Sequence, residues 1–419
     1  MQTNELVACH ECDLLHERIA LAPSSEAYCS RCGAFLYRVV AHGVERPLAL
    51  ALAALGLFLL AHVFPFVSLN IEGRTEQNLV VSGITALWQE GMVDLAVLVL
   101  LTSVVFPLLT IVALLWLTAP LKLGFRSVVG AGQVYRLMHA LGPWSLLAVF
   151  MLGALVAFVK LLDLANVIPG ISMLAFVALM LAATAANAAF VPQLLWPAEN
   201  DARSWFVPGV AVGHTAHDVG LLSCHVCSAL TPMDAANHGV ACHRCGVELH
   251  EHRKTNSLKR TWALVVAAAI MVVPANVYPV MTVTQLGRGE PSTIMSGVAA
   301  LIDGGMWGLA MIVFVASIVV PLAKLSLLVY LLLSVQRRSA WRPADRTRLY
   351  RVTEVVGAWS MVDIFLVAIL SALVNLDALA TIDPGIGASY FGAVVVLTMF
   401  AAQSFDPRLI WDHAVSDKR

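Results

Sequence analysis

The sequence predicts an all-α polytopic membrane protein made of two tandem four-helix transmembrane bundles, each preceded by a small cysteine module. Three observations predict it: the 419-residue chain has eight long apolar stretches, its halves repeat one another, and its cysteines form two matching sets. Mean hydropathy is +0.81. Charged residues make up 13% of the chain, against roughly 25% in a soluble domain. This composition excludes an ordinary soluble enzyme, a disordered protein and a nucleic-acid binder with a basic surface.

The apolar stretches are long enough to cross a bilayer. A hydrocarbon core about 30 Å thick requires roughly 20 apolar residues in a helix. The eight predicted spans are 47–71, 95–121, 137–159, 164–198, 261–287, 304–333, 355–376 and 384–405. Pro169-Gly170 interrupts the fourth. Residues 1–46 are polar and contain cysteines, so we expect no cleavable signal peptide.

The distribution of Lys and Arg predicts the orientation. With the N-terminus in the cytosol, all 26 of these residues lie on the cytosolic side except Arg74, Arg288, Lys160 and Lys324. An excess of positive charge marks cytosolic segments. Both termini and the central polar block are therefore predicted to be cytosolic.

The second half of the chain repeats the first at an offset of 213–215 residues. The clearest matches are Ser82-Gly83-Ile84 with Ser296-Gly297-Val298, Phe106-Pro107 with Val320-Pro321, and Gly142-Pro143-Trp144-Ser145 with Gly357-Ala358-Trp359-Ser360. Four spans per copy give both copies the same topology, related by an axis along the membrane normal. The predicted domains are a cysteine module (1–46), a bundle (47–198), a linker with a second module (199–259), a bundle (260–411) and a tail (412–419). We expect a substrate path at the interface between the bundles.

All eight cysteines fall in C-x-x-C pairs. They are Cys9 with Cys12, Cys29 with Cys32, Cys224 with Cys227, and Cys242 with Cys245. Sixteen residues separate the pairs in the first set and fourteen in the second. Two such pairs can place four sulfurs around one tetrahedral ion. Gly33 and Gly246 follow the last cysteine of each set, where glycine permits the positive φ of such a turn.

Each set predicts a structural zinc site of the zinc-ribbon type. Cytosolic thiols stay reduced, which disfavours the alternative of two disulfides per module. A redox-active dithiol is a further alternative, and iron fits the same sulfurs. Four thiolates leave no open coordination position for catalysis. We therefore interpret His10, His225 and His243 as surface residues, and we expect metal binding to supply the folding energy of each module.

Two charged residues lie inside predicted spans. Lys324 and Asp363 are each about twelve residues, or roughly 18 Å, from the cytosolic end of their spans. A charge at such depth costs roughly 2.5–3.5 kcal/mol on insertion scales. Opposite charges at equal depth on sequential helices can pair. The pair is either a static contact that fixes helix register or a proton- or substrate-responsive pair lining a polar cavity.

Other polar positions have two interpretations each. Lys160 lies near the far interface, where it either extends to the headgroup region or contacts a lipid phosphate. His62 either packs with a hydrogen bond or titrates. The six arginines of 337–351 are either a solvated positive-inside signal or a site for anionic headgroups. Residues 79–88 are apolar enough to lie at the membrane interface.

Several segments resemble the paraquat-inducible protein A family. They are Pro274-Ala275-Asn276-Val277-Tyr278-Pro279, Pro291-Ser292-Thr293-Ile294, Trp359-Ser360-Met361-Val362-Asp363-Ile364-Phe365 and Phe405-Asp406-Pro407-Arg408-Leu409, together with the paired cysteine modules. The resemblance covers essentially the whole chain. It implies a multi-pass inner-membrane protein of a Gram-negative bacterium that works with a periplasmic MCE-domain protein. That partner would form a tunnel for phospholipid between the membranes, and this chain would load or unload it to support outer-membrane integrity.

The resemblance also implies roles for individual residues. Both cysteine sets would bind zinc, and Lys324, Ser360 and Asp363 would form a polar core in the second bundle. The first copy departs from this pattern, since it has Thr110 and Ala148 at the positions of Lys324 and Asp363. His62 likewise stands where the second copy has Asn276. This asymmetry suggests that the second bundle carries the chemistry and the first is a scaffold or docking surface.

No P-loop, kinase, GxSxG or metalloprotease motif occurs, so we expect no enzymatic activity. Two other functions compete with lipid transport. A membrane-anchored metal or redox sensor would respond to changes at the cysteines and not to changes inside the membrane. A transporter of a small solute would work without an MCE-domain partner.

Overall fold

The computed structural model describes residues 6–19, 21–22, 25–39, 43–71, 74–125, 127–162, 166–196, 213–233, 241–249, 256–285, 288–373 and 380–412. Within these residues, eight helical segments are long and apolar enough to cross a membrane, which confirms the predicted number of spans. The predicted linker at 199–212, the predicted tail at 413–419 and the side chain of Lys160 lie outside the described part.

The first copy forms spans one to four. Span one is α1 (Glu45–Val63) and span four is α7 (Ile171–Ala189). Span two consists of α3 (Val93–Leu100), the π-helical turn η1 (Leu101–Val105) and α4 (Phe106–Lys122). Span three consists of α5 (Ala131–Leu141), the 3₁₀ turn η2 (Gly142–Trp144) and α6 (Leu147–Leu162).

The second copy repeats this pattern. Span five is α10 (Ser257–Val277) and span eight is α16 (Ile386–Ser404). Span six consists of α12 (Trp307–Phe314), the π-helical turn η5 (Val315–Val319) and α13 (Val320–Gln336). Span seven consists of α14 (Pro343–Gly357), the 3₁₀ turn η6 (Ala358–Met361) and α15 (Val362–Leu373).

The interruptions of spans two and six have an identifiable cause. Pro107 and Pro321 stand at the start of α4 and α13, directly after the π-helical turns. A proline inside a helix has no N–H to donate and its ring crowds the preceding turn. A single π-helical turn accommodates it. The buried serine of each turn donates to the carbonyl four residues before it. Ser103 Oγ donates to Val99 O at 2.7 Å, and its counterpart Ser317 Oγ donates to Val313 O at 2.6 Å.

The chain forms two small sheets where spans one and five were predicted to continue. The strands are β5 (Val67–Ile71), β6 (Arg74–Asn78), β7 (Asn166–Pro169), β10 (Met281–Gln285), β11 (Arg288–Ser292) and β12 (Ala380–Pro384), in the orders β6-β5-β7 and β11-β10-β12. The predicted ends of spans one, four and five were therefore wrong. Residues before a proline favour extended backbone, and Phe64, before Pro65, is extended and ends α1.

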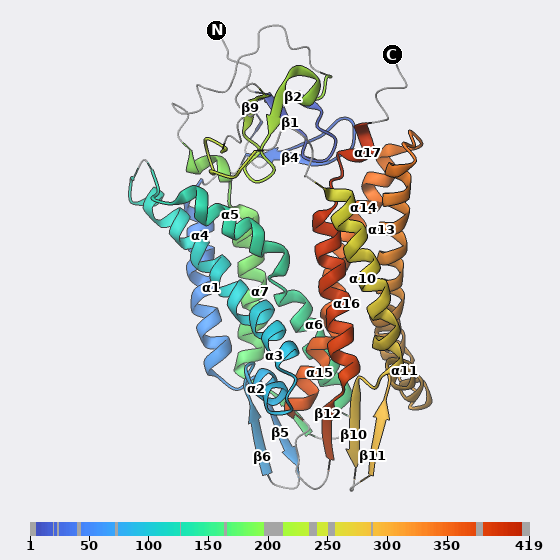
Figure 1. The fold of residues 1–419 in the computed structure, drawn as a ribbon. Helices are drawn as coiled ribbons and strands as arrows, with labels where there is room; N and C mark the ends of the chain where they lie inside the picture. Colours follow the sequence, from blue (N-terminus) through green and yellow to red (C-terminus); the bar gives the residue numbers. More distant parts are fainter. Residues whose placement is uncertain are drawn as a thin grey trace.

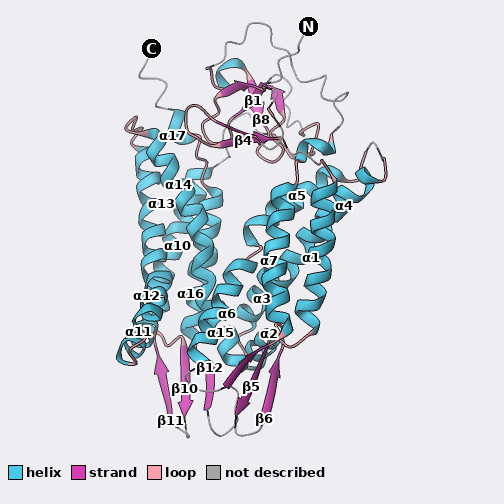
Figure 2. Ribbon diagram, turned by 180° about the vertical axis from the view of Figure 1, so that it is seen from behind, coloured by secondary structure: helices cyan, strands magenta, loops and turns pink. Residues whose placement is uncertain are grey.

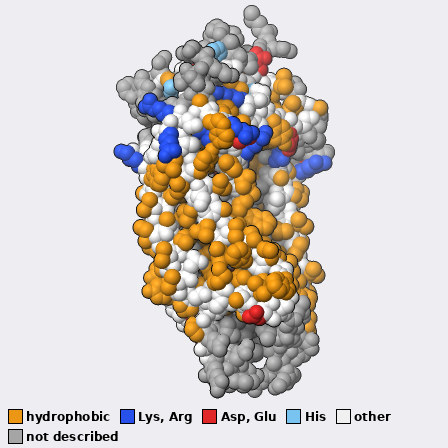
Figure 3. Space-filling model, turned by 90° about the vertical axis from the view of Figure 1, so that its right-hand side faces the viewer, with side chains coloured by type: hydrophobic (Ala, Val, Ile, Leu, Met, Phe, Trp, Pro, Cys, Tyr) orange, Lys and Arg blue, Asp and Glu red, His pale blue; other side chains and the backbone are white. Residues whose placement is uncertain are grey.

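Two ends of the molecule can be distinguished (Figures 1 and 2). At one end, the module end, lie β1 (Leu6–Ala8), β2 (Leu15–Glu17), β3 (Glu26–Tyr28), β4 (Phe35–Arg38), η4 (His217–Val219), β8 (Leu221–Ser223), β9 (Leu230–Pro232) and α17 (Leu409–Asp412). The two sheets project at the opposite end, the hairpin end, beside α2 (Ser82–Gln89) and α11 (Ile294–Asp303). Helix α2 forms most of the predicted interfacial segment at 79–88. Hydrophobic side chains cover the middle of the face in Figure 3, and the visible Lys and Arg gather towards the module end.

The two copies meet through α6 and α15. The rings of Phe150 and Phe365 lie 5.3 Å apart, and a Cβ on Gly153 would lie 3.0 Å from the Cβ of Phe365. Phe176 belongs to the same buried apolar core, which extends through both bundles. The shared interface that we expected to hold a substrate path is therefore packed with side chains along α6 and α15.

Gly83 permits one of these contacts, and replacing it should destabilise the protein. A Cβ at Gly83 would lie 2.8 Å from the backbone carbonyl oxygen of Ala368 on α15. Because backbone cannot move aside as a flexible side chain does, we expect Gly83→Ala to cost about 1–3 kcal/mol. Gly297 is the matched control, since the nearest atom to its added Cβ would be Ser292 Oγ at 3.6 Å. Thermal unfolding in detergent should show a lower midpoint for Gly83→Ala only. Equal shifts in both variants would contradict this account of the packing.

Candidate metal centres and intramembrane polar site

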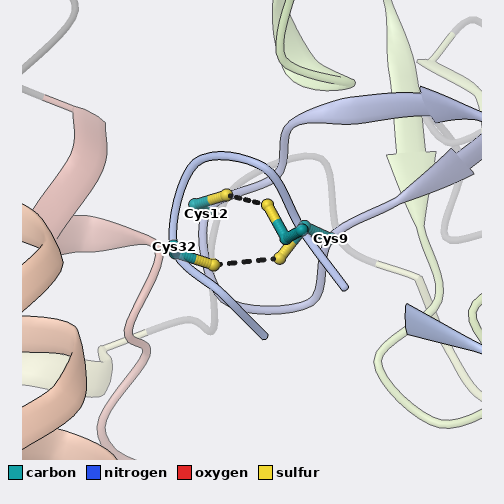
Figure 4. Close-up of side chains that lie close together, drawn as sticks. Cys9, Cys12 and Cys32 are labelled. Carbon is teal, nitrogen blue, oxygen red and sulfur yellow. Dashed lines mark hydrogen bonds between the residues drawn. The ribbon is translucent and has the colours of Figure 1, made fainter. Parts of the chain in front are cut away.

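The first cysteine set forms a compact sulfur cluster. The Sγ atoms of Cys9 and Cys32 are 3.5 Å apart, as are those of Cys12 and Cys29. All four sulfurs lie within 4.8 Å of one another. Figure 4 shows the side chains of this set turned toward one another. A tetrahedral ion with metal–sulfur bonds of about 2.3 Å requires sulfurs about 3.8 Å apart, so the cluster fits a metal of this kind.

The second set has the same geometry. Cys224 and Cys245 sulfurs are 3.5 Å apart, and those of Cys227 and Cys242 are 3.5 Å apart. All eight cysteines are free, so the alternative of two disulfides per module is not what the structure contains. Both candidate clusters consist of cysteines alone, as expected, and none of the three neighbouring histidines belongs to them.

The turns that hold the sulfurs confirm the positive φ predicted for the glycine after the last cysteine of each set. The residues after the other two C-x-x-C pairs have the same backbone. Gly33 and Gly246 have φ of +70° and +69°. Asp13 and Ser228 occupy the same place after the other C-x-x-C pairs, with φ of +61° and +58°. Each turn closes with a backbone hydrogen bond, such as Gly33 N–H to the carbonyl of Cys29 at 2.9 Å. Aspartate and serine accept this backbone at some cost, so sequence reasoning found only the glycine positions.

The sulfurs influence one another's protonation. Hydrogen bonding with Cys29 and Cys32 raises the pKa of Cys12 above its usual range. Hydrogen bonding from Cys12 lowers the pKa of Cys29 below its usual range. His16, which the sequence did not single out, has its Nε2 3.3 Å from Cys29 Sγ. Thiolate, which is the metal-binding form, is thus favoured at Cys29 and disfavoured at Cys12.

Module one, the described residues of 6–39, docks on the second bundle. The guanidinium of Arg351 on α14 donates to the Glu11 carboxylate, with Nε–Oε1 at 2.7 Å. It also donates to the carbonyl oxygens of Cys32 at 2.9 Å and Gly33 at 3.4 Å. The Arg31 guanidinium lies 4.4 Å from the ring centroid of Trp411 on α17.

Module two, described at 213–233 and 241–249, docks on the first bundle. Arg136 on α5 donates from Nη1 to the carbonyl of Gly246 at 3.1 Å. Trp196 Nε1 donates to the carbonyl of Arg244 at 3.2 Å. A Cβ on Gly132 of α5 would lie 2.9 Å from the Cα of Cys245, so glycine is needed for this close approach.

The docking is therefore crossed between the copies. Arg136 and Arg351 are repeat counterparts, as are Gly246 and Gly33, and each arginine binds the glycine carbonyl of the module that precedes the other bundle. The modules are also joined to each other, since Leu15 N–H donates to His214 O at 3.0 Å. The two cysteine modules thus connect the two bundles at the module end.

One interpretation of the arginine-rich segment at 337–351 was a solvated positive-inside signal. The structure contradicts it for part of the segment. Its second half belongs to α14. Arg346 is fully buried and donates to Ser334 Oγ at 3.2 Å and to Ser339 O at 2.7 Å. Arg351 holds module one. These two arginines were missed because a basic segment at a membrane boundary matches the positive-inside pattern whatever its contacts.

The structure places the predicted intramembrane residues around the interruption of span seven. Lys324 lies on α13, Ser360 in η6 and Asp363 in the first turn of α15, and all three are buried. The Lys324 ammonium lies against Gly357, the last residue of α14. The C-terminal end of a helix favours a cation, and the first turn favours an anion. Lys324 and Asp363 therefore occupy the two helix ends that best suit their charges.

Gly357 was seen in the sequence only as part of the repeat, yet it makes room for Lys324. Any Cβ at this position would overlap the ammonium group. Because that group ends a flexible side chain, we expect Gly357→Ala to fold with a loss of thermal midpoint of only a few degrees while displacing the amine. Detergent resistance of cells, which the family resemblance predicts this chain to support, should fall as in a Lys324 variant. The repeat counterpart Gly142→Ala, with open space at its Cβ, is the control and should behave like wild type.

Two other predicted positions are Lys160 and His62. Lys160 lies in the last turn of α6, and its side chain is outside the described part. His62 Nδ1 lies 2.8 Å from the carbonyl of Phe58, and the two rings stack with centroids 4.0 Å apart. These contacts favour the packing interpretation of His62.

A partly open cavity of about 1080 Å³, with both polar and apolar lining, lies between the modules and the module-end halves of the bundles. Its lining comes from both copies, and includes His10, Arg244, Tyr135 on α5, Glu354 on α14 and Ser404 on α16. The helices α5 and α14 stand apart at this end in both ribbon views. The bundles are thus packed together along α6 and α15 and separated by this cavity at the module end.

Comparison with known proteins gives a consistent result. The family model for "Paraquat-inducible protein A" matches residues 44–199 and 258–415, one match for each bundle. Intermembrane transport protein PqiA of Escherichia coli K12 is 35% identical over 410 residues, covering 97% of this chain and 95% of that protein. Lipophilic envelope-spanning tunnel protein A of the same strain is 30% identical over 407 residues, covering 96% and 90%. A probable intermembrane transport protein of Haemophilus influenzae is 28% identical over 416 residues, covering 97% and 96%. No solved structure gave a significant match.

Proposed function

The chain belongs to the paraquat-inducible protein A family, and from this premise we propose that it is an inner-membrane component of a lipid-transport system. In this proposal it loads or unloads phospholipid for a periplasmic MCE-domain tunnel between the inner and outer membranes. Relatives named for intermembrane transport and for an envelope-spanning tunnel support envelope transport. Their names also fit a role without catalysis.

One observation carries the lipid assignment: two buried opposite charges at an interruption inside span seven. Ionisable residues inside membranes are expensive and mark substrate or proton pathways. Interrupted helices in transporters direct their polar ends at the substrate. A phospholipid combines a phosphate, which Lys324 could bind, with acyl chains that suit the surrounding apolar helices. Asp363 would respond to protonation or to the arrival of the headgroup.

The orientation follows the charge distribution. The module end, where the Lys and Arg of Figure 3 gather, would face the cytosol, with both termini. The sheets at the hairpin end would then face the periplasm, where the MCE-domain partner would dock. Lipid would pass between two places. One is the region where α6 packs against α15, and the other is the periplasmic partner.

We propose zinc as the metal of both clusters. Four cysteine sulfurs at tetrahedral spacing suit zinc or iron, and a closed Cys₄ site without an open coordination position suits a structural ion. The ions would keep each module folded. Since each module is bound to the bundle of the other copy, the folded modules would brace the cytosolic face.

Purification in mild detergent and deletion of the gene test this proposal together. We expect an MCE-domain protein to copurify with the chain, and we expect the deletion strain to become sensitive to detergents. A protein that purifies without such a partner and without a barrier defect would favour the small-solute transporter. A phenotype caused by cysteine variants alone would favour the sensor.

A further inference from the structure

The two sheets at the hairpin end have four edge strands in the part of the chain that the structure describes. They are β6 and β7 on either side of β5, and β11 and β12 on either side of β10. An edge strand presents unpaired backbone groups to which another chain can add, and proline is one of the devices that prevent it. Pro169 in β7, Pro291 in β11 and Pro384 in β12 are of this kind. Strand β6 contains no proline.

The backbone of β6 faces outward at Gln77, which occupies the place that Pro291 occupies in β11. Proline in a sheet stands where its nitrogen faces away from the ladder. The neighbouring residue agrees, because the carbonyl of Asn78 accepts from Phe66 N–H at 2.7 Å and is therefore directed into the sheet. Inward and outward residues alternate along an antiparallel strand. Thr75 and Gln77 thus direct N–H and C=O to the open edge, where Pro291 has no N–H to donate.

We propose that β6 is a docking strand, beside which an extended segment of the periplasmic partner adds to the sheet through the backbone groups of Thr75 and Gln77. Addition of a strand to an open sheet edge is a recurring mode of protein recognition, in which main-chain hydrogen bonds supply affinity. The inference rests on the proposed function and locates the partner contact within it. It assigns the contact to the first copy, while the polar intramembrane residues lie in the second.

The position of β6 favours a periplasmic segment over a second copy of this chain. In both ribbon views β6 lies closer to the middle of the molecule than α1 and α4 (Figures 1 and 2). Paired strands are about 4.8 Å apart, whereas the axes of packed helices are about 8–10 Å apart. Two upright copies on this side would therefore meet through α1 and α4 before their β6 strands could pair. A segment that approaches from beyond the hairpin end meets no such obstacle.

Two substitutions of Gln77 test the docking strand. Gln77→Pro removes the outward N–H and should keep the pairing with β5, because the repeat has Pro291 at this place. Gln77→Ala shortens the exposed side chain and keeps the N–H, so it is the matched control. After extraction in mild detergent, we expect roughly tenfold less of the MCE-domain protein to copurify with Gln77→Pro than with Gln77→Ala. Pro291→Gln should recover as much as wild type.

Photo-crosslinking in native membranes identifies the occupant and does not depend on the folding of the proline variant. A benzoylphenylalanine residue replaces Gln77 or Pro291, which are both exposed. Mass spectrometry of the adducts identifies the captured protein. We expect an adduct with the copurifying MCE-domain protein at position 77, and at least tenfold less of it at position 291.

Three outcomes would overturn the docking strand. They are equal recovery of the partner with Gln77→Pro and Gln77→Ala, equal adducts at positions 77 and 291, and an adduct at position 77 that joins two copies of this chain. Each of them leaves the proposed function intact, because copurification with the wild-type chain and the barrier defect of the deletion strain are measured separately. A wild-type chain that recovers no MCE-domain protein would instead contradict the proposed function, and the docking strand with it.

Discussion

Cells that carry Asp363→Asn should lose outer-membrane protection against detergent although the protein still inserts. The substitution keeps the shape of the side chain and removes the negative charge that the first turn of α15 favours. Lys324→Met should have the same effect, because the ammonium at the end of α14 is removed. Survival in detergent measures the phenotype, and membrane abundance of the variant confirms insertion. Thr110→Val, at the counterpart of Lys324, is the matched control and should keep wild-type resistance.

The double variant Lys324→Met with Asp363→Asn separates the two interpretations of these charges. If Lys324 and Asp363 form the predicted buried pair, loss of one member costs about 3–5 kcal/mol and removal of both is often neutral. If the charges only fix helix register, the double variant should recover function together with thermal stability. We expect recovery of stability without recovery of detergent resistance. Recovery of both thermal stability and detergent resistance would show that the two charges form only a static contact.

Loss of the first metal centre should loosen the second bundle and not the first. In Cys9→Ser with Cys12→Ser, module one can no longer hold its metal, and the contacts of Glu11 with Arg351 on α14 are lost. Hydrogen bonds to charged groups contribute about 1.5–3 kcal/mol, so amide exchange in α14 and α17 should rise roughly ten- to hundredfold. Hydrogen-exchange mass spectrometry of the full chain measures it, with α5 as internal reference.

The mirror variant provides the control. Cys224→Ser with Cys227→Ser should raise exchange in α5, where Arg136 and Gly132 hold module two, and spare α14. If each variant instead loosens the bundle that follows it in the chain, the crossed docking is wrong. Arg351→Ala, compared with exposed Arg348→Ala, tests the same contact without disturbing the metal.

The sequence predicted the number of spans because apolar length is a strong signal at every one of them. It did not predict the interruptions, since the apolar composition continues through η1, η5 and η6. Pro107 and Pro321 were visible as repeat partners, but membrane-spanning helices tolerate a proline in their interior, so neither residue required an interruption. The sheets at the hairpin end were missed because β5, β7 and β10 continue the apolar stretches of the predicted spans one, four and five, whereas β6 and β11 are short and polar.

The candidate sites were predictable to different degrees. The spacing of the cysteines identified both sulfur clusters, because four ligands in two tight turns leave little choice of geometry. Lys324 and Asp363 were singled out because charged residues are rare in spans, and Ser360 was named through the family resemblance; their role stays a prediction. Crossed docking could not be predicted from the sequence, because the similarity of the two copies does not determine which bundle each module contacts. Glu11, Arg136 and Arg351 therefore had no visible role until the structure placed them together.

Native mass spectrometry of the gently extracted protein tests the central claim, that the second bundle binds phospholipid at the interruption of span seven. We predict a mass equal to the chain with two zinc ions and a retained phospholipid, and we predict that Lys324→Met keeps both ions and loses the lipid. A wild-type protein that carries both ions and no lipid, or a variant that retains lipid as wild type does, would contradict the claim.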